Sequence, residues 1–377
     1  MRSVRYGHDI ACMENLIPLH GANPENLYRA FDIPMPDEIL DFSTNTNILP
    51  WPKININVEK LASCYPDPEC RVLRELIAER ENISPSRVLF TNGTNEAIFL
   101  LARLFHESVA ILQPCYTEYS RAFPNAHNVF KLEEAGNFRA FILTNPNNPT
   151  GKYIANLSET IKRFPDTAFI IDEAYIDFVL SDRERERLFD FDNVIILRSL
   201  TKIFHLSGVR IGYVIANEEI ISRLKALQPT WSVNSIAQEL ALGFLRNTSF
   251  YEHTRAFYRE HTPKFIASIR QAGFEVMDSS VHYFLVRVED DIEVIKFLLR
   301  AGIIVRHTKN FPGLDGKYLR ISTLHMNQNE KLTQTLMMSK KFKSFVVENV
   351  VEKSWDKCVR EFLNVCIISQ TYVRIPP

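Results

Sequence analysis

Two hydroxyls, a primary amine and a guanidinium lie close together in the segment RSLTKIFHLSGVRIGY. They belong to Ser199, Thr201, Lys202 and Arg210. Hydroxyls and a guanidinium can clamp a phosphate, and an amine among them suits a Schiff base. A structural lysine would normally lie on a solvated helix face, whereas Lys202 closely follows the apolar run NVIIL (193–197). The segment therefore predicts a phosphate clamp beside a reactive lysine.

Two further segments place polar side chains directly after apolar runs. In IIDEAYIDF (170–178), Asp172 ends a run that we expect to be a buried strand. A carboxylate in that place is costly unless it is paired. In TNPNNPTG (144–151), a rigid Asn/Pro turn presents Asn148 at a fixed position. Taken alone, this second segment could be only a turn.

The segment LFTNGTNEAIFLLARLF (89–105) predicts a strand, a tight glycine turn and an apolar helix. The backbone amides of Gly93, Thr94 and Asn95 at that helix start would bind a phosphate, with help from the helix dipole. An N-capped helix explains Thr94 equally well. All four segments occur together at the ends of predicted strands, where open α/β sheets bind ligands.

From about residue 88, the elements that must position these residues repeat one pattern. A short β-rich run is followed by a turn and then by a longer helical stretch. This pattern predicts βαβ units and a mainly parallel sheet. The expected strands are VLF (88–90), VAIL (109–112), AFILT (140–144), AFIID (168–172), NVIIL (193–197) and RIGYVIA (210–216). Most are apolar on both faces, as buried parallel strands are.

A second, smaller α+β domain is expected after a long helical region. Its strands are HYFLVRV (282–288), GIIVRH (302–307) and KYLRIST (317–323). We divide the chain into an N-terminal arm that closes over the active site (1–40), a large domain (41–260), a small domain (261–345) and a C-terminal helical tail (346–377).

Composition excludes several classes of function. Lys plus Arg (44) nearly cancels Asp plus Glu (45), and no basic block stands out, so nucleic acid and anionic membranes are unexpected partners. The six cysteines form no C-x-x-C pair, and the histidines have no metal-ligand spacing, so no metal site is predicted. Without a signal-like apolar stretch, we expect a soluble cytoplasmic protein.

The order and spacing of NPNNPTG, DEAY and SLTK, followed by Arg210, strongly resemble the fold-type-I pyridoxal-5′-phosphate (PLP) enzymes of the aminotransferase class I/II family. The resemblance covers about residues 19–331. It implies an α/β fold like that of aspartate aminotransferase, with a mostly parallel seven-stranded sheet in the large domain and a smaller α+β domain.

The resemblance also implies roles for individual residues around PLP. Lys202 would hold the cofactor as a Schiff base and move protons, and Asp172 would pair with the ring nitrogen to make the ring an electron sink. Asn148 and Tyr175 would bind the phenolic oxygen. Tyr116 would stack on the ring, unless it is only a core tyrosine. The phosphate would be held by Gly93, Thr94, Asn95, Ser199, Thr201 and Arg210, with Thr201 where a serine is common.

Tyr65, in CYPDP, would reach the cofactor phosphate of a neighbouring subunit, which implies a homodimer with shared active sites. Arg320, in KYLRIST, matches the family's clamp for the substrate carboxylate, although it could be an exposed surface arginine. Arg306, in GIIVRH, adds a second cation. Two guanidiniums facing one pocket suggest a substrate with two anionic groups, such as a carboxylate and a phosphate.

Within this family the chain resembles threonine-phosphate decarboxylases most and histidinol-phosphate aminotransferases next. The likeness rests on PLHGANPENLYRAFDIP (18–34), DFSTNTNILPWP (41–52), VRHTKNFPGLDGKYLRIS (305–322) and QNEKL (328–332). It implies that the loop of His20, Gly21 and Asn23, with Ser43, closes over the substrate phosphate. Relatives tend to have H-G-G-N there, and Ala22 in place of the second glycine is expected to disfavour a left-handed conformation.

Three functions follow. The first is decarboxylation of phosphoserine or phosphothreonine, the second is amino transfer on a substrate such as histidinol phosphate, and the third is a non-catalytic PLP-binding protein or scaffold. The intact Lys202, Asp172 and Arg320 argue against the third. PLP weakens whichever bond at the substrate Cα stands perpendicular to its ring, so orientation decides between the first two.

Overall fold

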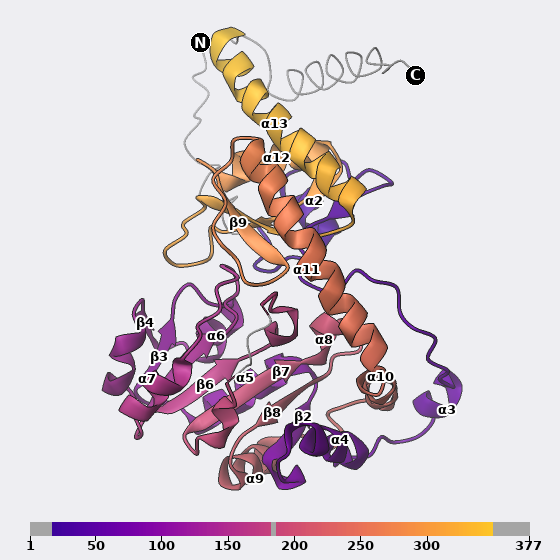
Figure 1. Ribbon diagram of the computed structural model, residues 1–377, viewed down its shortest axis with the longest axis vertical. Coiled ribbons are helices and arrows are strands. Elements are labelled where there is room, and N and C mark those ends of the chain that lie inside the picture. Colours follow the sequence, from indigo (N-terminus) through magenta and orange to yellow (C-terminus); the bar gives the residue numbers. More distant parts are fainter. Residues whose placement is uncertain (1–16, 182–185, 350–377) are drawn as a thin grey trace, which may run out of the picture.

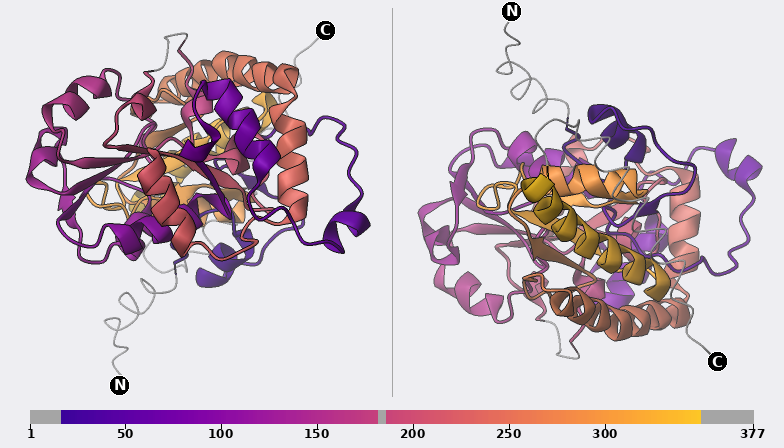
Figure 2. Two further views of the ribbon diagram at one scale, coloured as in Figure 1. Left: turned by 90° about the horizontal axis from the view of Figure 1, so that it is seen from below. Right: turned by 90° about the horizontal axis from the view of Figure 1, so that it is seen from above.

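The computed structural model describes residues 17–181 and 186–349. Figure 1 shows a large sheet flanked by helices, and above it a smaller part. The long helix α11 (Thr248–Gln271) runs from the larger part into the smaller one, which also contains α12 (Asp291–Arg300) and α13 (Met326–Asn349). Seen from above in Figure 2, α13 lies across the top of the molecule, where it packs on α11 and α12.

The larger part is built on a seven-stranded sheet with the order β2–β8–β7–β6–β5–β3–β4. The strands are β2 (Val88–Thr91), β3 (Val109–Leu112), β4 (His127–Val129), β5 (Ala140–Thr144), β6 (Ala168–Asp172), β7 (Val194–Ser199) and β8 (Gly212–Ile215). Strand β8 is antiparallel to β2 and β7, and the remaining pairs are parallel. The six predicted strands and the mostly parallel sheet are confirmed. Strand β4 was not predicted, because it is short and two of its three residues are exposed and polar.

Helices connect these strands and cover both faces of the sheet. They are α3 (Val58–Ala62), α4 (Arg71–Glu81), α5 (Gly93–Leu104), α6 (Thr117–Ala122), α7 (Leu157–Arg163), α8 (Leu200–Ile203), α9 (Glu218–Leu227) and α10 (Ser235–Leu245). Short 3₁₀ turns are η1 (Pro85–Arg87), η2 (Leu132–Asn137), η3 (Ile176–Phe178) and η4 (Leu188–Asp190).

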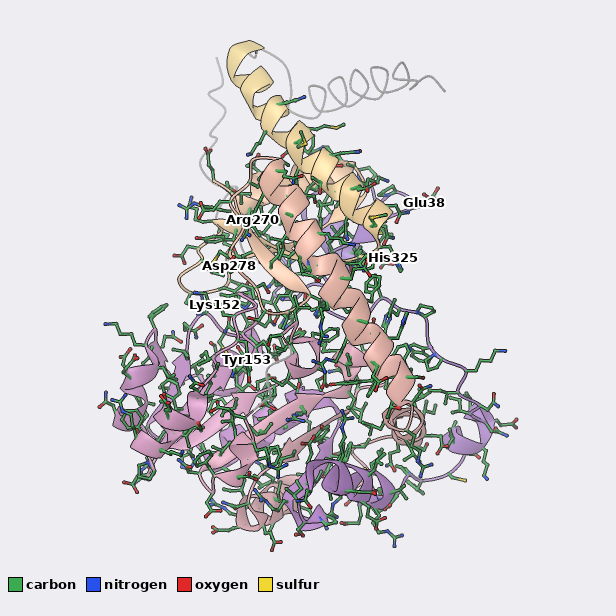
Figure 3. The ribbon with its side chains drawn as sticks, in the orientation of Figure 1. Glu38, Lys152, Tyr153, Arg270, Asp278 and His325 are labelled. Atoms are coloured by element: carbon green, nitrogen blue, oxygen red, sulfur yellow. The ribbon has the colours of Figure 1, made fainter. Side chains whose placement is uncertain are left out.

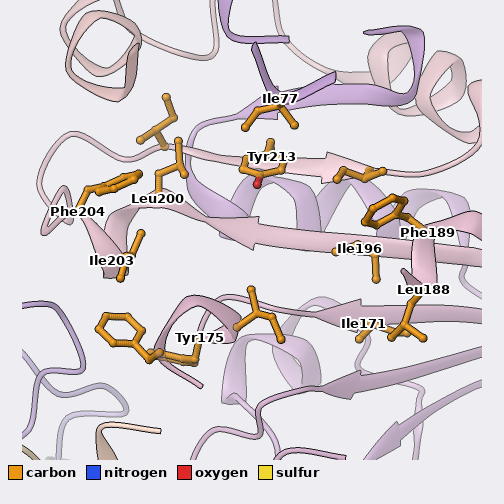
Figure 4. Close-up of a cluster of buried hydrophobic side chains, with 14 of the residues drawn as sticks. Ile77, Ile171, Tyr175, Leu188, Phe189, Ile196, Leu200, Ile203, Phe204 and Tyr213 are labelled. Carbon is orange, nitrogen blue, oxygen red and sulfur yellow. The ribbon is translucent and has the colours of Figure 1, made fainter. Parts of the chain in front are cut away.

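Successive residues of the central strands point to opposite faces of the sheet. Ile171 and Ile196 pack in one core, drawn in Figure 4, which also contains Ile77 of α4. Ile170 and Ile195 pack in the second core, against α5 and α9. Because both faces are buried, these strands are continuously apolar, and a polar residue is tolerated only where a strand ends.

The register of the parallel strands brings their carboxyl ends together. Thr144 of β5 lies opposite Asp172 of β6, and Asp172 lies opposite Leu197 of β7. Ser199 ends β7, and α8 begins at the next residue. The chemistry-bearing segments therefore emerge at one edge of the sheet.

The smaller part contains two further sheets. A three-stranded antiparallel sheet has the order β11 (Arg306–His307), β12 (Tyr318–Ser322) and β9 (Tyr283–Arg287). A parallel pair joins β1 (Leu40–Asp41) to β10 (Ile303–Ile304). The segment GIIVRH, predicted as one strand, is thus divided between β10 and β11, which pair with different partners.

The N-terminal segment packs on the smaller part. Helix α2 (Pro24–Ala30) contributes Leu27 and Tyr28 to the core that also holds residues of α12 and β12. The predicted domain boundaries stay predictions. Of the predicted tail helix, the backbone of α13 reaches residue 349, and 350–377 lie outside the described residues. None of the helices in the described ranges has the length and apolar character needed to cross a membrane.

The NPNNPTG turn joins the two parts. The backbone N–H of Ser280 donates to the Gly151 carbonyl at 2.9 Å, and the Tyr283 hydroxyl donates to the Asn147 carbonyl at 3.0 Å. Gly151 has a φ of +73°, and a Cβ there would lie 2.8 Å from the Tyr283 carbonyl oxygen, so the close approach requires glycine. Figure 3 places Lys152, the next residue, at this junction.

Candidate active site

A cavity that is open to solvent lies at the carboxyl ends of β5, β6 and β7. It is lined by residues from all four segments that sequence reasoning selected. The predicted residues among its lining are Thr94, Asn95, Tyr116, Asn148, Asp172, Tyr175, Ser199, Thr201, Lys202 and Arg210. The structure therefore brings together side chains that are more than a hundred residues apart in the chain.

One end of the cavity is defined by the Asp172 carboxylate. Asp172 is 5% exposed, and its two oxygens accept hydrogen bonds from the Ala174 N–H and the Tyr119 hydroxyl, both at 2.9 Å. Burial raises the pKa of Asp172, against the lowering effect of these two donors and of the charge of Lys202. A cationic nitrogen placed against this carboxylate would favour its ionised form. Tyr119 was missed by sequence reasoning, because no motif marks it.

The other end of the cavity can hold a phosphate. The hydroxyls of Ser199 and Thr201 lie 2.6 Å apart, and both residues line the cavity with Arg210. Gly93 begins α5 with a φ of +71°, and a Cβ on it would lie 2.8 Å from Nη2 of Arg210. Gly212 of β8 allows a similar approach to the Thr94 N–H. Hydroxyls, a guanidinium and the start of a helix of 12 residues thus converge on one place.

Lys202, in the short helix α8, also lines the cavity. Its carbonyl accepts a hydrogen bond from the Asn47 N–H at 2.9 Å, which ties α8 to the segment that follows β1. Tyr175 packs edge-on against Tyr283, and its hydroxyl accepts a hydrogen bond from Nδ2 of Asn45 at 3.4 Å. Asn45 was missed as a site residue, although it belongs to the DFSTNTN block that carried the resemblance.

The two predicted aromatic residues lie in different places. Tyr116 lines the cavity, and its hydroxyl donates to Oδ1 of Asn95 at 3.3 Å; burial raises its pKa to about 12. Tyr65 is 80% exposed and packs against Trp231 with ring centroids 4.6 Å apart. It does not line this chain's own cavity, and its role toward a neighbouring subunit stays a prediction.

Arg306 and Arg320 lie directly opposite each other on β11 and β12. Both are buried, at 4% and 6% exposed, which excludes an exposed surface role for Arg320. Arg320 donates to Oδ1 of Asn148 and to the Ser43 carbonyl, each at 2.6 Å. Because Asn148 lines the cavity, Arg320 adjoins it, and Arg306 lies next to Arg320 on the neighbouring strand.

Each of these guanidiniums also keeps a buried nitrogen, Nη1 of Arg306 and Nε of Arg320, that has no hydrogen-bond partner among residues 17–181 and 186–349. No carboxylate of the described residues forms an ion pair with either one. Burial lowers the pKa of Arg306 to about 9, with a further contribution from Arg320, and burial also lowers that of Arg320. Two buried like charges with unused donors form a site for anions.

The loop predicted to close over the substrate lies beside this pair. His20 Nε2 is 2.8 Å from Oε1 of Glu118, and the His20 ring lies 5.7 Å from that of Tyr116. Gly21 packs so closely on Ser43 that a Cβ would lie 2.9 Å from the Ser43 carbonyl oxygen. Asn23, by contrast, is exposed at the start of α2, and the structure shows no contact between it and these groups within the described residues.

Ala22 departs from the expectation. It adopts a φ of +65°, so the left-handed conformation survives without the second glycine, and its N–H donates to Oγ of Ser43 at 3.1 Å. The hydrogen bond holds the backbone in a conformation that costs an alanine about 1 kcal/mol. The loop therefore keeps the geometry that the substitution was expected to disfavour.

The chain matches the aminotransferase class I and II family over residues 52–336. The arrangement of its elements is the α/β fold of aspartate aminotransferase. The chain therefore belongs to the aminotransferase class I and II family.

Named relatives carry more than one activity. The chain is 29% identical to threonine-phosphate decarboxylase of Salmonella typhimurium over 84% of this chain and 95% of that protein. It is 30% identical to histidinol-phosphate aminotransferase of Flavobacterium psychrophilum over 72% of this chain and 85% of that protein. It also shares its fold with histidinol-phosphate aminotransferase of Sinorhizobium meliloti, solved with pyridoxal-5′-phosphate, at a TM-score of 0.74 and 20% identity, over 90% of this chain and 99% of that one.

The cavity fits this cofactor. Its lining offers a buried carboxylate for a ring nitrogen, an amine for an aldehyde and the aromatic face of Tyr116. The close approach of Gly93 to Arg210 leaves room for a phosphate that a side chain would fill.

Proposed function

We propose that this chain is a PLP-dependent decarboxylase of an O-phosphorylated amino acid, converting phosphoserine to ethanolamine phosphate or phosphothreonine to aminopropanol phosphate. The observation that carries the proposal is the buried pair of Arg306 and Arg320, which keep spare donors and of which Arg320 contacts Asn148 in the cavity wall. A phosphorylated amino acid brings two anionic groups, one for each guanidinium. The similarity to threonine-phosphate decarboxylases supports the same substrate class.

The alternative is an aminotransferase acting on a phosphorylated substrate such as histidinol phosphate. Histidinol phosphate has no carboxylate, so it would neutralise only one of the two arginines. The alternative retains support because an amino-group acceptor such as 2-oxoglutarate carries two carboxylates and could use both. The similarity to histidinol-phosphate aminotransferases also favours it.

When bound, the cofactor supplies an electron sink for the bond at the substrate Cα that stands perpendicular to its ring. The residues of this chain decide which bond that is. Arg320, fixed by Asn148 and the Ser43 carbonyl, would hold the carboxylate. Arg306 would hold the phosphate, and the two contacts together would set the torsion at Cα. Lys202 would then deliver a proton to Cα after decarboxylation, or remove one for transamination.

Tyr65 supports a proposal about assembly. Its side chain is 80% exposed beside Trp231, itself 48% exposed, which is unusual for two large aromatic residues. We propose a homodimer in which this pair lies at the interface and Tyr65 reaches the partner's cofactor. Size-exclusion chromatography with light scattering tests the assembly.

The test of function is an assay of two products over one substrate panel. Phosphoserine, phosphothreonine and histidinol phosphate are each incubated with the PLP-loaded protein, with and without 2-oxoglutarate. Release of CO₂ without consumption of the keto acid is expected. Amino transfer to 2-oxoglutarate without CO₂ would establish the alternative instead.

The control for PLP chemistry is a pair of lysine variants. Lys202→Ala should abolish both turnover and the absorption band of the lysine-bound cofactor. Lys264→Ala, at a surface ion pair on α11, should change neither. A wild-type protein that gains no such band when PLP is added would contradict the proposal at its first step.

A further inference from the structure

Glu118 is a buried carboxylate with no role in the proposed binding of cofactor and substrate. It lies in the first turn of α6, and its side chain is 4% exposed. Its oxygens accept hydrogen bonds from Nη1 of Arg121 at 3.1 and 3.0 Å, and Oε1 also lies 2.8 Å from Nε2 of His20. Arg121 is 65% exposed, so its pairing alone gives no reason to bury the carboxylate. The contact with His20 is therefore the other candidate reason for the burial of Glu118.

His20 belongs to a segment that touches both parts of the molecule, residues 18–22, which we call the strap. On the side of the smaller part, the Pro18 carbonyl lies 3.0 Å from Nε2 of His307. The Leu19 carbonyl accepts hydrogen bonds from Arg306 and from Asn310. On the side of the sheet, the His20 side chain forms a hydrogen bond with Glu118 and lies beside the Tyr116 ring. Glu118 thus anchors the far edge of the strap.

The contact with Glu118 also determines which ring nitrogen of His20 is left to bind a ligand. A carboxylate only accepts hydrogen bonds, so Nε2 of His20 must carry a proton at this contact. The second nitrogen, Nδ1, has no hydrogen-bond partner within the described residues. The ring lies 5.7 Å from Tyr116, which lines the cofactor cavity. Nδ1 is therefore the ring atom left for a ligand at the cavity.

We infer that Glu118 is a positioning residue, which holds His20 and the strap over the anion site and thereby raises affinity for the phosphorylated substrate without touching it. The effect on substrate affinity rests on the proposed function, whereas the contact that anchors the strap does not depend on it. A purely structural role for Glu118 would be confined to α6, and would leave the strap and His20 unaffected by its loss. The two roles therefore differ in what happens at residues 18–22.

The first experiment measures the strap without any substrate. Amide hydrogen exchange of the peptide that covers residues 18–22 is compared in the PLP-loaded wild type and its variants. Glu118→Ala should raise the exchange rate about tenfold, and Glu118→Gln, which keeps an acceptor oxygen, should raise it less. Glu107→Ala removes an exposed carboxylate, 71% exposed, and should leave the rate unchanged. Unchanged strap exchange in Glu118→Ala would overturn the inference.

The second experiment measures coupling through His20 during turnover of the phosphorylated substrate. Glu118→Ala and His20→Ala should each raise KM about tenfold with kcat changed by less than about twofold. The double variant should be no worse than His20→Ala alone, because Glu118 acts through His20. Additive effects in the double variant would refute this route. Should phosphorylated substrates not react at all, the proposed function fails, while the exchange measurement still decides the role of Glu118.

Discussion

Replacing Arg306 by methionine is expected to stabilise the ligand-free protein and, at the same time, to weaken its affinity for phosphorylated ligands. The reason is the arrangement on β11 and β12, where Arg306 and Arg320 are buried side by side and no carboxylate of the described residues forms an ion pair with either one. The buried Asp291 carboxylate offsets only part of the cost of the Arg306 charge. Methionine keeps the length and apolar body of the side chain but removes the charge. The site would lose its function and gain stability.

The magnitude follows from the pKa of Arg306, which burial and Arg320 lower to about 9 from an ordinary 12.5. Such a difference corresponds to a cost of about 5 kcal/mol for holding the charge in the folded protein. Against this, the variant loses the hydrogen bonds to the Leu19 carbonyl and to Asn310, at roughly 1.5 to 3 kcal/mol each. The Leu19 carbonyl remains bonded to Nδ2 of Asn310. A small net gain, on the order of 1 kcal/mol, and a rise of about 2 °C in melting temperature are expected.

The assay is thermal unfolding of the PLP-loaded protein with and without phosphothreonine, together with KM for phosphorylated and unphosphorylated substrates. The KM for the phosphorylated substrate should rise at least about tenfold in Arg306→Met, and that for an unphosphorylated amino acid should change far less. Arg287→Met, at an exposed arginine on strand β9 of the same sheet, is the matched control and should change neither quantity appreciably. A large fall in the melting temperature of Arg306→Met, with equal losses for both substrates, would refute the reasoning.

Two further predictions concern the phosphate-binding glycine and a buried histidine. Gly93→Ala should weaken PLP binding about tenfold in a spectroscopic titration, because its Cβ would lie 2.8 Å from Nη2 of Arg210 at a φ of +71°. Gly208→Ala, whose Cβ would meet nothing within 4 Å, should bind PLP normally, and equal affinities in the two variants would contradict the cradle. Burial lowers the pKa of His282 to about 3, below the 6.5 of an unfolded chain. Between these two pH values only the unfolded state binds the proton, so the free energy of unfolding falls as the pH drops below 6.5. By pH 5 the loss of unfolding free energy amounts to roughly 2 kcal/mol. Urea unfolding at pH 7 and pH 5 should show a smaller loss for His282→Asn than for the wild type. Identical losses in the two proteins would contradict this role of His282.

Sequence reasoning predicted the elements that position the site, because their signals are local. Runs such as AFILT and AFIID are continuously apolar and end in turn-forming or polar residues, so their place as buried parallel strands could be predicted from neighbours in the chain. The convergence of Asn148, Asp172 and Lys202 followed from the rule that parallel strands share a carboxyl edge. Strand β4 and the division of GIIVRH were not predicted, since short strands are determined by their pairing partners.

The residue types at the cavity were thus determined by the sequence alone, and their partners were decided only by the tertiary structure. Nothing local shows that Tyr119 donates to Asp172 or that Arg306 lies opposite Arg320 with unused donors. The same holds for the contact between His20 and Glu118, which are 98 residues apart. Such contacts depend on how distant elements pack. The apolar pattern of a run and its tendency to form a strand follow from adjacent residues, whereas pairing and burial between runs arise only when the whole chain has folded.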